Sequence, residues 1–142
     1  MAEQHTFGPV PVPSEPFARA DLEIYGIDHF RPSYVADIYF NAGPDDPGAV
    51  PAGHFTIFGH DRCVGDEGHC DVPDHQRRFD DRPSSPLTKA FKRVVVTEPL
   101  RSIVTTGVPE LRITIVANID PADEGYDGTI VDIEGLQLAL FA

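Results

Sequence analysis

The stretch ADLEIYGIDH, residues 20–29, decides the fold class because its side chains change sides at every position. One side carries Leu22, Ile24 and Gly26, and the other carries Glu23, Tyr25 and Ile27. A period of two residues is typical of an extended strand that buries one of its faces. The stretch therefore predicts a β-strand that packs on a hydrophobic core.

Similar alternation recurs in SYVADIYFN (33–41), HFTIFG (54–59), KRVVVTE (92–98), LRITIVAN (111–118) and GTIVDIEGLQLALFA (128–142). In the last stretch we expect a strand to begin before Gly135, with Ile130 and Val131 on opposite faces. Residues 98–107, EPLRSIVTTG, predict one short helical segment closed by Gly107. About six or seven strands, many turns and no strand–helix–strand alternation predict an all-β fold, an antiparallel β-sandwich or barrel.

The chain has 142 residues, which is enough for one domain with a buried core. Residues 8–16, GPVPVPSEP, contain four prolines, which disfavour a helix and favour an extended chain. We therefore expect an extended Pro-rich arm at residues 1–19, regular structure from Ala20 onward, and a single β-sandwich domain at residues 20–142.

The charge balance argues against two classes of partner. With 11 basic and 23 acidic residues, the formal net charge is -12, whereas nucleic acids and anionic membranes are bound by clustered Lys and Arg. No apolar segment reaches the roughly 18 to 20 residues of a membrane span, and residues 1–20 lack the features of a signal peptide. We expect no nucleic-acid or membrane partner. The localisation is cytoplasmic by default, unless an export signal lies elsewhere.

The stretch GHFTIFGHDRCVGDEGHCDVPDH, residues 53–75, holds four of the six histidines and both cysteines. In an extended strand His54 and His60 would lie roughly 20 Å apart, so we expect His54 to be a partly buried strand histidine. The spacing H-x2-C-x5-H-C instead groups His60, Cys63, His69 and Cys70. Two thiolates and two imidazoles suit tetrahedral zinc or a soft ion such as Cu(I). These four residues, the Cys/His quartet, are the predicted metal ligands.

Two other interpretations of the quartet stay open. A Cys63–Cys70 disulfide would close an eight-residue loop and would stabilise the fold by about 2 to 3 kcal/mol. Alternatively, both thiols are free. Catalysis is the weaker interpretation, because no nucleotide-binding, hydrolase or metalloprotease motif is present.

The order of the segments resembles a known family. LEIYGID, YVADIYFN, AGHFTIFGH, VVVTEPLRSI, LRITIVAN and IVDIEGLQLALF together resemble the C-terminal β-sandwich domain of tyrosinases and polyphenol oxidases, over most of residues 20–141. Leu22 to Asp28, Val35 to Asn41 and Ala52 to Phe55 match the family's short strand motifs, and residues 92–141 match its pattern.

The resemblance implies a non-catalytic domain that shields the active site of a tyrosinase-type catalytic domain. The catalytic centre of that family needs six histidine ligands for two coppers, and this chain has six histidines in all, none in an H-x3-H pair. The resemblance also implies copper binding or delivery through the quartet, with zinc as the alternative ion, and an apolar plug at Phe58 or Phe79. The alternative functions are a free-standing metal-binding β-sandwich and a disulfide-stapled binding module without metal.

Overall fold

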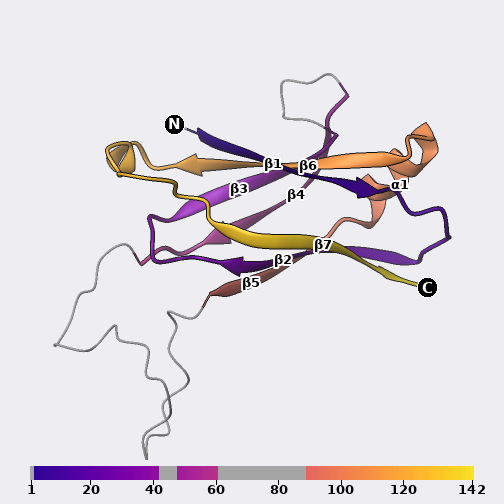
Figure 1. The fold of residues 1–142 in the computed structure, drawn as a ribbon, viewed down its shortest axis with the longest axis horizontal. Coiled ribbons are helices and arrows are strands. Elements are labelled where there is room, and N and C mark those ends of the chain that lie inside the picture. The colour runs from indigo at the N-terminus through magenta and orange to yellow at the C-terminus, as the bar shows by residue number, and fades with distance from the viewer. Residues whose placement is uncertain (1, 42–47, 61–88) are drawn as a thin grey trace, which may run out of the picture.

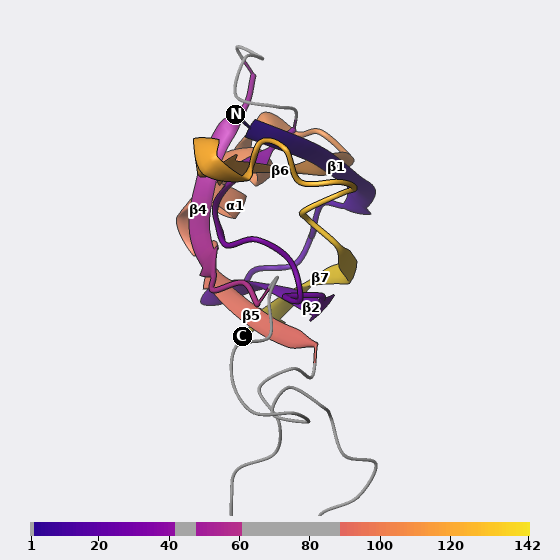
Figure 2. The same cartoon turned by 90° about the vertical axis from the view of Figure 1, so that its left-hand side faces the viewer.

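The alternating segments form antiparallel strands of two facing sheets, which confirms the all-β sandwich (Figures 1 and 2). The computed structural model describes residues 2–41, 48–60 and 89–142. In chain order its elements are β1 (Ala2–Pro11), β2 (Arg19–Ile27), β3 (Tyr34–Phe40), β4 (Val50–Ile57), β5 (Ala90–Val95), helix α1 (Thr97–Thr106), β6 (Glu110–Ile119), the short 3-10 helix η1 (Pro121–Asp123) and β7 (Ile133–Phe141). One sheet has the order β1-β6-β3-β4 and the other β5-β2-β7.

The core lies between the two sheets and is built by every second residue of the central strands. Leu22 and Ile24 on β2 face this space, as do Ile38 on β3 and Ile113 and Ile115 on β6, and all five side chains are buried. Burial of one such side chain contributes about 1.5 to 3 kcal/mol. Burial of the hydrophobic side chains at these alternating positions therefore contributes much of the stability of the sandwich.

Helix α1 covers one end of the sandwich (Figure 1) and buries Leu100 and Ile103. It ends at Gly107, whose φ of 77° lies in the left-handed region that glycine tolerates. The expected strand at residues 92–98 is wrong at its end, because β5 stops at Val95 and the helix starts at Thr97. Pro99 favours this boundary, since proline fits the first turn of a helix and cannot donate in a strand ladder.

Regular structure does not begin at Ala20, so that expectation is wrong. Residues 2–11 form β1, which pairs with β6 at the edge of the larger sheet. An edge strand bonds a neighbour on one side only, so it tolerates prolines that a central strand would exclude. The register shifts between Phe7 and Val10, around Pro9, as expected for a bulge at that position.

The residues just before β7 do not follow the alternation that was expected for residues 128–142. Ile130 and Val131 precede the strand and are both buried, although they were expected on opposite faces of one strand. Their backbone N–H groups donate to the Glu3 carboxylate at 3.0 and 2.7 Å rather than to a neighbouring strand. Glu3 on β1 thereby fixes the β6–β7 connection, a contact between residues far apart in the sequence.

We expect Glu3→Ala to lower the free energy of unfolding by about 2 to 3 kcal/mol, because two buried N–H groups would lose a charged acceptor. Burial alone would raise the pKa of Glu3, but the hydrogen bonds from Ile130 and Val131 and the nearby His5 outweigh it, so the pKa lies below its ordinary value. The stabilisation is therefore complete above the ordinary pKa of glutamate and is lost as the pH falls through the lowered folded-state value.

Urea unfolding of the wild type and Glu3→Ala at about pH 7 and about pH 3 measures this pH dependence. The stability gap between the two proteins should narrow at the lower pH. A gap that stays the same at both pH values would contradict the role of the ionised carboxylate.

Candidate functional site

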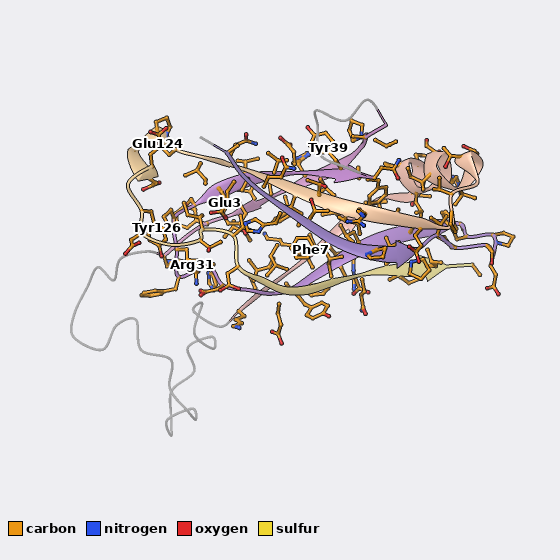
Figure 3. All side chains as sticks on the ribbon, turned by 45° about the horizontal axis from the view of Figure 1, so that its top comes forward. Glu3, Phe7, Arg31, Tyr39, Glu124 and Tyr126 are labelled. Carbon is orange, nitrogen blue, oxygen red and sulfur yellow. The ribbon has the colours of Figure 1, made fainter. Side chains whose placement is uncertain are left out.

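The end of the sandwich opposite α1 brings together three connections, and we call it the histidine end (Figure 1). It comprises residues 28–33 between β2 and β3, residues 58–60 after β4, and residues 120–132 between β6 and β7. Figure 3 shows Glu3, Arg31 and Tyr126 at this end. Side-chain hydrogen bonds join the three connections to one another and to β1.

Asp28 and Arg31 hold the connections together. The Asp28 carboxylate accepts from the N–H of Phe30 at 2.9 Å and from Nε of Arg31 at 3.2 Å. Arg31 in turn pairs with Asp132 at 3.0 Å and donates to the carbonyl of Thr129. Burial would raise the pKa of Asp28, but these two hydrogen bonds and the charge of Arg31 lower it overall. The carboxylate therefore stays ionised and keeps the β2–β3 connection folded.

The imidazole rings of His29 and His60 lie against each other where the β2–β3 connection meets the chain after β4. His29 is 9% exposed, and its ring centre lies 5.3 Å from that of His60, with the two ring planes at 79°. The backbone N–H of His60 donates to the carbonyl of His29 at 2.7 Å. One position earlier, the N–H of Gly59 donates to the Ser33 hydroxyl at 2.8 Å. The main chain after β4 is thus fixed against the β2–β3 connection at two successive residues.

Phe58 stands beside this pair and points into solvent. It is 78% exposed, the largest exposed fraction among the large hydrophobic side chains of the described residues, and its ring centre lies 5.8 Å from that of His60. A shallow groove of about 280 Å³ runs next to it, lined in part by Val35, Thr56 and Asn118. An exposed aromatic ring beside a partly apolar groove is typical of a surface that contacts another molecule.

Tyr34 lies beneath the groove and is 3% exposed. Its ring packs edge-on against Phe55, and its hydroxyl has no hydrogen-bond partner within the described ranges. Burial and the nearby carboxylates of Glu3 and Asp132 raise the pKa of Tyr34. The phenol is therefore neutral under ordinary conditions and can act as a hydrogen-bond donor but not as a base.

The structure places only part of the predicted site. His60 lies at the histidine end, whereas Cys63, His69 and Cys70 fall outside the described residues, as does the alternative plug residue Phe79. Within residues 2–41, 48–60 and 89–142, no group of three or more His, Cys, Asp or Glu residues could hold a metal ion.

His54 lies on β4, as expected, but its side chain is exposed rather than partly buried. It pairs across the sheet with Asp37 on the face of the sheet that points away from the core. The alternation along β4 explains this, since the neighbouring Phe55 takes the inward position.

Sequence reasoning missed His29. It lies two residues after the end of β2 and 31 positions before His60, so no motif spacing links the two residues. The two residues come together because β3 pairs antiparallel with β4, which places the end of β4 beside the start of β3 and so beside the β2–β3 connection. That pairing is a property of the folded chain and not of a local pattern.

Comparison with known proteins adds no family assignment. A scan against protein-family models and a search of curated proteins both found no match. Within the part of the chain that the structure describes, no helix has the length and apolar character needed to span a bilayer.

Proposed function

We propose that this chain is a non-catalytic accessory domain that covers the active-site entrance of a tyrosinase-type copper oxidase with its histidine end. The observation that carries the proposal is the exposure of Phe58, which is 78% accessible at the tip of the sandwich. A shielding domain needs an apolar side chain that projects from a rigid support into a cleft. Phe58 meets that requirement because the next residue, Gly59, is tied to Ser33.

The surroundings of Phe58 support the same role. Phe30 and Val35 belong to the adjacent connection and strand, and they are 47% and 45% exposed. If a partner covered these side chains, burial would contribute a binding free energy of about 25 cal/mol for each Å² of apolar area removed from water. The acidic chain, with a net charge of -12, would favour a partner surface that is neutral or basic around its entrance.

The resemblance to tyrosinase C-terminal domains gives the partner class. The segments that carry it lie on strands β2 to β7 and on helix α1 of one sandwich. The copper part of the proposal assigns binding or delivery of the ion to His60, Cys63, His69 and Cys70, with zinc as the alternative ion. Two thiolates favour Cu(I), and neighbouring imidazoles would pass it on by stepwise ligand exchange.

The proposal is tested on the dicopper oxidase encoded in the same precursor or in a neighbouring gene. We expect the added chain to lower the rate of catechol oxidation in a saturable manner and limited proteolysis of the chain to restore it. A genome without such an oxidase, or an oxidase with an unchanged rate at saturating chain, would contradict the proposal.

Thiol titration with metal analysis separates the metal interpretation from the disulfide-stapled module. Protein purified without added metal should hold near-stoichiometric copper or zinc, and Cys63→Ser should release it. Two thiols that react only after reduction, in protein that contains no metal, would favour the disulfide. A metal-loaded chain with no effect on the oxidase would favour a free-standing metal-binding sandwich.

A further inference from the structure

We propose that β7 is the contact strand of a homodimer, in which the β7 strands of two copies of this chain pair antiparallel across a two-fold axis. The pairing joins two three-stranded sheets, each of order β5-β2-β7, into one continuous sheet. Because both copies use the same strand, the contact is closed and does not propagate into a fibre. The inference goes beyond the shielding role and does not rest on it, since it concerns a strand and not the histidine end.

Strand β7 has a free edge. It pairs with β2 from Ile133, opposite Ile27, to Phe141, opposite Arg19, and within the described ranges no other strand is bonded to it. Figure 2 shows β7 at the border of the smaller sheet, on the side away from β4. Every second residue of such a strand bonds its neighbour, so the residues between them direct their N–H and C=O groups to the free edge.

The other three edge strands each carry a feature that opposes pairing with a further strand. β1 has Pro9 and Pro11 and a shift of register, β4 has Pro51, and β5 is six residues long and carries Lys92 and Arg93. Prolines, bulges, short strands and lysines are the means by which edge strands avoid pairing with other chains. β7 has none of these features: it is nine residues long, lacks proline and pairs with β2 without a shift of register.

Charge also favours β7 as the contact between two copies. Each chain has a formal net charge of -12, so two copies repel each other wherever acidic surfaces meet. Glu134 is the one charged residue of β7, and its side chain lies over Gly26 of β2. The remaining residues of the strand are Ile, Gly, Leu, Gln, Ala and Phe, so two copies meet along it without acid facing acid.

Pairing over the full length of the strand places the two-fold axis at Gln137, the middle residue of β7. Phe141 then lies opposite Ile133 of the second copy, which forms an apolar cross-strand pair that stabilises the joined sheet. Glu134 lies opposite Leu140 of the second copy, so the two carboxylates are kept apart. Phe141 is 47% exposed in the single chain, and the pairing therefore covers apolar surface.

Sedimentation velocity at about 1 to 500 μM chain tests the inference, because a contact through one strand is small and gives a micromolar dissociation constant. We expect the 15.5 kDa chain to convert to its dimer as the concentration rises. Gln137→Lys and Gln137→Glu each set two like charges opposite one another at the axis and should weaken dimerisation about tenfold or more. Gln4→Lys is the matched control, because Gln4 is an exposed glutamine on the edge strand β1, and it should dimerise as the wild type does.

An equal mixture of Gln137→Lys and Gln137→Glu should recover wild-type dimerisation, because the introduced ammonium then faces the introduced carboxylate. This recovery also shows that both variants are folded. In the wild type, amide hydrogen exchange along β7 should slow as the concentration rises, whereas exchange along β1 should not change.

A wild type that stays monomeric at about 500 μM would overturn the inference and leave the edge to an extended segment of another protein. A dimer that neither Gln137 variant weakens would overturn it as well. Protection of the β7 amides that does not depend on concentration would also overturn it, since another part of the same chain would then occupy the edge.

Discussion

Replacing Gly59 with alanine is expected to lower the free energy of unfolding by about 3 kcal/mol or more and to separate His60 from His29. A Cβ atom at this position would overlap the carbonyl oxygen of Arg31 and would lie 2.5 Å from the carbonyl carbon of Pro32 and 2.6 Å from the nitrogen of Ser33. All three atoms belong to the backbone, so no side-chain rotation relieves the contact. Urea unfolding measures the loss of stability.

The β2–β3 connection must move away to admit the methyl group, and the bonds of Gly59 and His60 to Ser33 and His29 would break with it. Gly125→Ala is the control, because no atom lies within 4 Å of a Cβ built there. Its stability should stay within about 0.5 kcal/mol of wild type. If Gly59→Ala were as stable as Gly125→Ala, the close packing of the two connections would be contradicted.

The strands of the sandwich were largely predictable because their signal is local. Buried residues alternate with less buried ones along β3, and the large buried side chains Leu22 and Ile24 of β2 and Ile113 and Ile115 of β6 also recur at every second position. This period of two is a property of any extended strand. The prolines near β1 argued against a paired strand there, because proline is excluded from a central strand. An edge strand tolerates them, and β1 is at an edge. That position is decided by β6, roughly a hundred residues along the chain.

The candidate site was less predictable, because its contacts join residues that are distant in sequence. Sequence spacing grouped His60 with three residues that lie outside the described ranges and set His54 apart from it. It could not show that His29 lies against His60, or that Phe58 is the exposed ring beside them. Both facts depend on how the end of β4 packs on the β2–β3 connection, which Gly59 permits.

Under the proposed shielding role, Phe58→Ala is expected to weaken binding of the chain to a tyrosinase-type oxidase about 30-fold, which corresponds to about 2 kcal/mol. An aromatic ring that fills a cleft in a partner loses most of its contact area when it is truncated to a methyl group. In the isolated chain the ring is 78% exposed, so the same change should alter stability by less than about 0.5 kcal/mol. The affinity of the wild type and that of Phe58→Ala are obtained by measuring the inhibition of catechol oxidation at increasing concentrations of each protein.

The inhibition constants of wild type, Phe58→Ala and Phe141→Ala for this oxidase test most directly whether the histidine end covers the active-site entrance. Phe141 is a matched control because it is 47% exposed and ends β7 at the opposite end of the sandwich (Figure 1). The shielding role predicts that Phe141→Ala inhibits as strongly as wild type and that Phe58→Ala requires about 30 times more chain. Equal constants for all three proteins, or a greater loss for Phe141→Ala, would contradict it.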